Sequence, residues 1–98
     1  MSVATIRTEH GVFLHKWEAR KQLVVLQHNL CCYCRVSLTW QFPANRPLAA
    51  TCATLEHIVP VARGGANHIR NLAVSCNRCN ARRGTTPHEE FMNVYRDR

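Results

Sequence analysis

Apolar residues in the first third of the chain follow the period of a helix. From about Leu14 to Leu30 they recur at spacings of three and four residues, which places them on one face. The residues on that face are Ala19, Leu23, Leu26 and Leu30. The pattern predicts an N-terminal helix that covers the core. Before it, Val3–Ile6 is either a short strand or a frayed start.

Two short apolar runs bounded by turn residues predict a β-hairpin. Leu55–Val59 ends at Pro60, and Asn71–Ser75 forms the second run. The loop between them contains Gly64 and Gly65, where glycine permits a positive φ. We therefore expect the second run to return as a strand beside the first.

Helical patterns resume after this hairpin. Cys76–Arg83 is predicted to be helical, and Gly84 is suited to end it. Thr86 begins a capping box that leads into a final short helix, with Phe91 and Tyr95 on one side. Strands and helices in this order indicate an α+β fold.

The segment 35–53 has little periodicity and is expected to be a loop, with one extended piece around Leu38–Phe42. The whole chain, residues 1–98, fits one domain. A domain of this size buries only about 60–65% of its unfolded surface, so it benefits from a covalent or metallic staple. No secretory signal or membrane-length apolar span is evident, and a reducing cytoplasm is the expected setting.

Six cysteines offer either three disulfides or a metal site, and a reducing setting favours the metal. Four of them form two pairs with two-residue gaps. The pairs are Cys31 with Cys34 and Cys76 with Cys79. Two such pairs predict a tetrahedral Zn²⁺ site of the structural kind, without an open coordination position. Cys32 and Cys52 lack this spacing and are expected to pack as small apolar residues.

A second set of ligands lies in the same part of the sequence. Cys76, Cys79 and Asn80 share one face of the predicted helix, so zinc would fix the Asn80 amide. The Glu56 carboxylate and the Asn80 carbonyl are hard donors that suit Mg²⁺ or Mn²⁺. The neighbouring His57 suits a general base, because an imidazole ionises near neutral pH. Such a group beside a divalent cation favours phosphodiester hydrolysis.

The step from Glu56 to His57 conflicts with regular strand geometry. Adjacent strand residues point to opposite faces, so both side chains join one site only if a bulge or a strand end reorients one of them. We therefore predict irregular backbone at Glu56–His57.

The chain is strongly basic. Its net charge is +7, and 11 of its 13 basic residues are arginines, whose forked guanidinium suits phosphate. No acidic residue occurs between positions 63 and 83. We expect four arginines of this stretch to contact nucleic-acid phosphates without reading sequence: Arg63, Arg78, Arg82 and Arg83.

Taken together, these motifs resemble the HNH endonuclease family, also called ββα-metal or His-Me finger nucleases. The resemblance spans about residues 31–84. It is carried by the sequences CCYC (31–34), EHIVP (56–60), GG (64–65), NL (71–72) and CNRCN (76–80). It implies a β-hairpin and a helix that clasp one divalent cation beside a four-cysteine zinc site.

By position, the resemblance implies that Glu56 and Asn80 hold the cation and that His57 is the general base. Asn71 matches the middle asparagine, which in this family steadies the hairpin and the base. Two departures are visible. Glu56 stands where aspartate is common, and arginines at 82 and 83 stand where a lysine is common.

The expected function is a metal-dependent endonuclease that nicks or cleaves duplex DNA. Two alternatives stay open: a zinc-stabilised nucleic-acid-binding module without catalysis, and an RNA-cleaving nuclease or toxin. No separate recognition module is evident, so we expect weak sequence specificity, a targeting partner or a homodimer. The family resemblance suggests a prokaryotic or phage setting.

Overall fold

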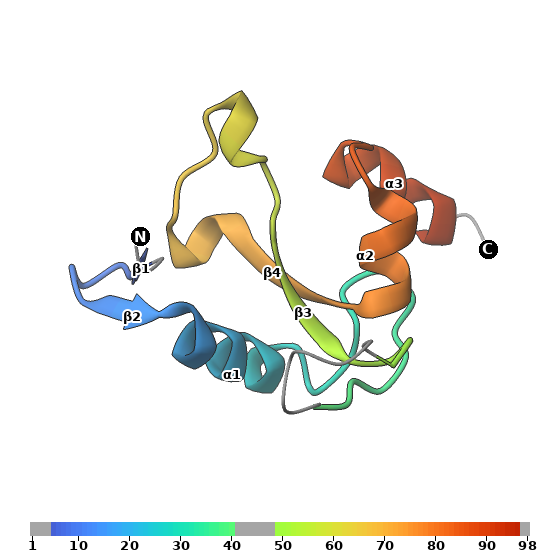
Figure 1. Cartoon of the computed structure of the whole chain (residues 1–98), viewed down its shortest axis with the longest axis horizontal. Coiled ribbons are helices and arrows are strands. Elements are labelled where there is room, and N and C mark those ends of the chain that lie inside the picture. Colours follow the sequence, from blue (N-terminus) through green and yellow to red (C-terminus); the bar gives the residue numbers. More distant parts are fainter. Residues whose placement is uncertain (1–4, 41–48, 97–98) are drawn as a thin grey trace.

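The computed structural model describes residues 5–40 and 49–96, with side chains in the last helix described as far as Asn93. Within these described residues, two antiparallel hairpins and three helices form a small α+β domain (Figure 1). In chain order the elements are β1 (Thr5–Arg7), β2 (Phe13–His15), α1 (Lys16–Leu26), β3 (Ala53–His57), β4 (Leu72–Cys76), α2 (Asn77–Arg83) and α3 (His88–Arg96). Two 3₁₀ turns, Val61–Arg63 and Ile69–Asn71, lie between β3 and β4.

The first helix does not open the chain, because the hairpin β1–β2 precedes it. Leu14, predicted to be helical, instead pairs with Ile6 in this hairpin. The side chain of His15 then caps α1 by accepting a hydrogen bond from the Trp17 N–H at 3.2 Å. At the other end, His28 has a φ of 56° and the next residue one of 63°, so the helix stops well before Leu30.

The apolar face predicted for α1 is only partly correct. Ala19 and Leu23 are buried, together with Val24. Leu26, which the spacing placed on the same face, is 71% exposed. It is the last residue of α1, and the chain turns away immediately after it.

The second hairpin, β3–β4, has regular antiparallel register from Ala53 opposite Cys76 to His57 opposite Leu72. Each strand is displaced by one or two residues from its predicted bounds. Glu56 pairs with Ala73 without a bulge, so the predicted irregular backbone at Glu56–His57 is wrong. On this regular ladder the two side chains point to opposite faces.

The outer edge of β4 is covered by side chains and loop backbone. The Gln27 amide accepts from the Val74 N–H at 2.9 Å and donates to the Val74 carbonyl at 2.8 Å. The Cys32 N–H also donates to the Val74 carbonyl, at 3.1 Å. The Cys76 N–H is bound by the Cys31 sulfur at 3.3 Å. Gln27 thus takes the place of a neighbouring strand.

The two C-terminal helices follow their predicted order. Cys76 caps the start of α2, and Gly84, with a φ of 50°, ends it. In α3, Phe91 is buried and packs edge-on against Tyr33, with ring centroids 4.8 Å apart. The predicted position of Tyr95 lies outside the described side chains.

The segment before β3 contains short bridges in its described part. Leu30 pairs with Ser37, and Thr39 pairs with Cys52. The rest of the predicted extended piece lies outside the described residues. Cys52 is buried, as expected of a packing residue, and Cys32 is half-buried against the core. None of the described helices is long and apolar enough to cross a membrane.

Candidate functional site

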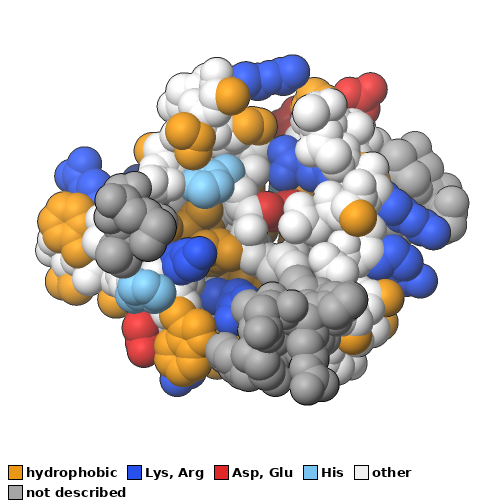
Figure 2. Space-filling view, in the orientation of Figure 1, with side chains coloured by type: hydrophobic (Ala, Val, Ile, Leu, Met, Phe, Trp, Pro, Cys, Tyr) orange, Lys and Arg blue, Asp and Glu red, His pale blue; other side chains and the backbone are white. Residues whose placement is uncertain are grey.

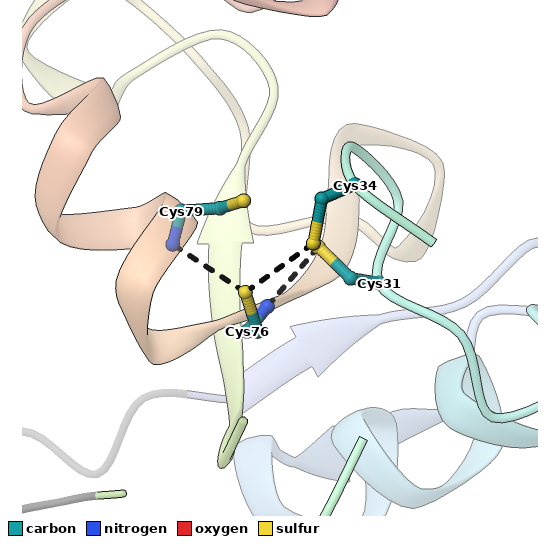
Figure 3. Close-up of side chains that lie close together, drawn as sticks. All are labelled: Cys31, Cys34, Cys76 and Cys79. Carbon is teal, nitrogen blue, oxygen red and sulfur yellow. Dashed lines mark hydrogen bonds between the residues drawn. The ribbon is translucent and has the colours of Figure 1, made fainter. Parts of the chain in front are cut away.

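Four cysteines from two distant segments meet beside α2 (Figure 3). The sulfurs of Cys31, Cys34, Cys76 and Cys79 all lie within 4.8 Å of one another, and none is in a disulfide. The Sγ atoms of Cys34 and Cys76 are 3.7 Å apart. Tetrahedral zinc with four thiolates at about 2.3 Å requires sulfurs roughly 3.8 Å apart. The cluster therefore fits a structural zinc ion.

Backbone N–H groups donate hydrogen bonds to the cysteine sulfurs and favour their thiolate form. The Cys31 sulfur accepts from the Tyr33 N–H at 3.4 Å and the Cys76 N–H at 3.3 Å. The Cys76 sulfur accepts from the Cys79 N–H at 3.4 Å. A hydrogen bond from Cys32, followed by these backbone donors, holds the pKa of Cys31 well below its usual range. Burial raises the pKa of Cys76, which a metal ion would offset.

Glu56 is buried, and among the described residues only one of its oxygens has partners. Its Oε2 accepts hydrogen bonds from the Tyr33 hydroxyl at 3.2 Å and the Arg83 Nη1 at 3.3 Å. Its Oε1 is fully buried and has no hydrogen-bond partner among the described residues. Burial raises the pKa of Glu56 despite these two donors. A buried carboxylate oxygen without a partner is what a metal ligand would leave in a protein without its ion.

Arg83 is turned into the protein and is 6% exposed. Besides Glu56, its Nη1 binds the His57 carbonyl at 3.1 Å and its Nη2 binds the Ile58 carbonyl at 3.1 Å. Its Nε donates to the Thr86 carbonyl at 2.8 Å. Arg83 therefore ties α2 to the end of β3. The other arginines predicted to contact phosphate, Arg63, Arg78 and Arg82, are exposed.

His57 lies at the end of β3 and is half-buried. Its Nε2 is 2.6 Å from the Asn67 Oδ1. Nearby, the Asn71 Oδ1 accepts from the Val59 N–H at 2.9 Å. The Asn71 Nδ2 donates to the carbonyls of Val59 and Ala66, each at 3.0 Å. Asn71 thus closes the loop that follows His57.

The residues predicted to form the cation site are not all joined by contacts in the structure. Glu56 and His57 come from adjacent strand positions, and Asn80 lies exposed on α2, one residue after Cys79. No hydrogen bond joins Asn80 to Glu56 or His57 among the described residues. Their grouping around one cation stays a prediction.

Sequence reasoning missed two neighbours of the buried carboxylate. The Tyr33 hydroxyl, which donates to Glu56, is 2.8 Å from the Nδ1 of His88. Burial lowers the pKa of His88, and the positive charge of Arg83 lowers it further. Tyr33 lies between the two cysteines of the first pair, Cys31 and Cys34, a segment called the cysteine knuckle below. That position was the only feature of the sequence that pointed to Tyr33. Nothing in the sequence marked His88.

One face of the molecule is hollowed. Figure 2 shows a depression near the centre of the molecule, with acidic atoms at its floor, basic side chains beside it and a histidine near its edge. A recess of mixed charge suits an anionic substrate together with a cation.

A family model described as HNH endonuclease matches residues 45–95, just over half of the chain. The chain belongs to the HNH endonuclease family. No curated protein and no solved structure matches it. The HNH match covers β3 to α3 and therefore includes Glu56, His57, Asn71 and Asn80. The N-terminal hairpin, α1 and the first cysteine pair lie before the matched residues. Membership in this nuclease family indicates a phosphodiester hydrolase.

Proposed function

We propose that this HNH protein is a metal-dependent endonuclease that hydrolyses DNA phosphodiester bonds and nicks or cleaves duplex DNA. The observation that carries the proposal is the buried Oε1 of Glu56, which has no hydrogen-bond partner among the described residues. His57 is the next residue and the last one of β3, so the proposal requires its side chain to turn toward the same site at this strand end. A carboxylate oxygen buried in this way is costly unless an additional partner binds it.

The donor set suits a hard divalent cation. Glu56 supplies a carboxylate oxygen and Asn80 an amide oxygen, and together they would hold Mg²⁺ or Mn²⁺ with water and phosphate oxygens. When bound, the cation supplies positive charge that stabilises the phosphorane and the departing oxygen. Zinc on the four cysteines serves the structure and not the reaction.

In this proposal His57 takes a proton from the attacking water. Asn71 holds the loop that follows His57, through its contacts to Val59 and Ala66. The exposed Arg63, Arg78 and Arg82 bind backbone phosphates, which positions the duplex without reading its sequence. Arg83 is left out of this set because it is buried. A reducing cytoplasm would keep the cysteines available to zinc.

The deciding experiment is nicking of supercoiled plasmid with Mg²⁺ or Mn²⁺. We expect the His57→Ala variant to lose roughly 10²- to 10⁴-fold in rate, the range that a general base contributes. His10→Ala, which changes an exposed histidine in the N-terminal hairpin, is the matched control. Zinc content and thermal melting should be unchanged in both variants. Wild-type nicking by His57→Ala would refute His57 as the base.

A second candidate function has one observation in its favour. The guanidinium of Arg83 already lies 3.3 Å from Glu56, so it offsets the charge that a divalent cation would use. Such a pair is consistent with a zinc-stabilised DNA-binding module without catalysis. DNA binding without nicking in Mg²⁺ or Mn²⁺ would favour the binding module. Parallel digestion of RNA and DNA separates an RNA nuclease from the proposed activity.

A further inference from the structure

The contact between His57 and Asn67 determines which nitrogen of the imidazole carries the proton. An amide oxygen only accepts hydrogen bonds, so at 2.6 Å from Oδ1 the His57 Nε2 must donate. In the neutral imidazole the proton then resides on Nε2, and Nδ1 keeps its lone pair. No partner for Nδ1 occurs among the described residues. Asn67 thus selects the tautomer and the ring orientation.

Asn67 is itself held in place by the N-terminal hairpin. The Arg7 N–H donates to the Asn67 carbonyl at 2.8 Å. Arg7 also forms a parallel bridge with His68, the residue after Asn67. Two residues after Arg7 in the chain, Glu9 forms an ion pair with Arg70 at 2.7 Å. The hairpin therefore holds the loop around Asn67 at two successive points (Figure 1).

A second clamp holds the other side of Asn67. The Asn71 Nδ2 donates to the carbonyl of Ala66, the residue directly before Asn67. The Asn67 backbone is thus fixed from both neighbours, while its side chain reaches His57. The hairpin lies outside residues 45–95, so this support comes from beyond the matched family region.

We propose that Asn67 is the positioning residue of His57 and that the hairpin β1–β2 braces it. This inference rests on the proposed function, in which His57 is the general base. Asn67 keeps the proton on Nε2, so that Nδ1 can accept the proton of water. Without Asn67 the ring can rotate and exchange tautomers, and fewer molecules present a basic nitrogen in the correct place.

Two substitutions of nearly equal shape test the hydrogen bond. Asn67→Leu removes the acceptor, whereas Asn67→Asp keeps an oxygen that can only accept. In plasmid nicking we expect Asn67→Leu to lower kcat by roughly 10- to 100-fold, within the contribution of a general base, at unchanged KM. Asn67→Asp should restore kcat close to the wild-type value. Asn93→Ala, at an exposed asparagine on α3, is the matched control.

The hairpin is tested with a backbone substitution. Arg7→Pro removes the N–H that binds the Asn67 carbonyl, and Arg7→Ala keeps it. We expect a several-fold loss of kcat for the proline variant and none for the alanine variant. Equal kcat for the two would overturn the bracing role of the hairpin.

A readout that does not depend on activity is the tautomer of His57, from its imidazole nitrogen chemical shifts in the full, zinc-loaded chain. We expect the proton on Nε2 in the wild type and in Asn67→Asp, and a mixture in Asn67→Leu. A proton on Nδ1 in the wild type, full kcat in Asn67→Leu or an Asn67→Asp variant as slow as Asn67→Leu would overturn the positioning role. If the wild type nicks no DNA but the tautomers behave as expected, the proposed function fails and the positioning role stands.

Discussion

At the scale of single residues, Asn71 continues the hairpin beyond the last strand pair. The register ends at His57 opposite Leu72, and the Asn71 amide then binds both the N–H and the carbonyl of Val59. The Asn71 side chain thereby makes the hydrogen bonds that a backbone strand would make, and it keeps the loop close to the hairpin. The backbone of Gly65 lies close to Val59 in the same loop. The Gly65 N–H donates a hydrogen bond to the Pro60 carbonyl at 3.0 Å and so holds it there.

The close approach at Gly65 leads to a stability prediction. A Cβ added there would lie 1.7 Å from the Val59 carbonyl oxygen and 2.9 Å from the Asn71 Nδ2. Since backbone atoms must move, we expect Gly65→Ala to lower the free energy of unfolding by about 3 kcal/mol. Gly64→Ala, where no described atom lies within 4 Å of the added Cβ and the obstacle is a φ of 90°, should cost about 1–2 kcal/mol. Urea denaturation measures both, and equal losses would contradict the steric argument.

At the scale of elements, α3 covers the cysteine knuckle and the buried carboxylate. Tyr33 links them: its ring packs against Phe91, and its hydroxyl contacts both His88 and Glu56. Because the hydroxyl has one proton and donates it to Glu56, it accepts from His88 Nδ1–H. The resulting order, His88 to Tyr33 to Glu56, makes the placement of the carboxylate depend on α3.

This chain of hydrogen bonds predicts a pH dependence of stability. Burial lowers the pKa of His88 in the folded protein, so as pH falls below about 6.5 the unfolded chain binds more protons at this residue. The free energy of unfolding should therefore decline with acidification more steeply in the wild type than in His88→Gln, which does not titrate. Urea melts at several pH values from about 5 to 8 measure the difference. Parallel curves would show that His88 contributes nothing.

At the scale of the whole molecule, the four cysteines join two halves of the chain. Cys31 and Cys34 follow α1, whereas Cys76 and Cys79 belong to the junction of β4 and α2. Zinc binding in such sites supplies an apparent 10–16 kcal/mol, roughly the entire stability of a small domain. Only the second pair lies inside the family match, so the folding unit extends further toward the N-terminus than the matched residues.

Loss of zinc should therefore unfold the domain. We expect a strong chelator, or Cys76→Ala, to abolish cooperative thermal unfolding followed by circular dichroism. Cys32→Ser, at a half-buried cysteine outside the cluster, keeps a hydrogen-bond donor beside Cys31 and should melt close to the wild type. Unchanged melting after verified removal of zinc would contradict the structural role of the site.

The sequence predicted best where spacing alone determines geometry. Two-residue gaps located the four cysteines, and short apolar runs located the hairpin β3–β4. Of the N-terminal hairpin, the sequence offered only a short strand at Val3–Ile6 as one of two alternatives, which β1 partly overlaps, because strands of three residues carry almost no periodicity. The sequence showed that Arg83 is charged, but not that its side chain points into the protein. It points inward because it binds carbonyls at the end of β3, and only the fold brings these carbonyls close to α2. Asn67 was missed for the same reason.

The covered outer edge of β4 has a consequence for self-association. An unpaired strand edge is a template on which another chain can add a strand, and this route leads to aggregation. Here the Gln27 amide already occupies both polar groups of Val74, and the Cys31 sulfur binds the next outward-facing N–H. A second copy would have to displace these partners before pairing at β4. This small sheet is thereby protected from edge-to-edge growth at these positions, and a zinc ligand contributes to that protection.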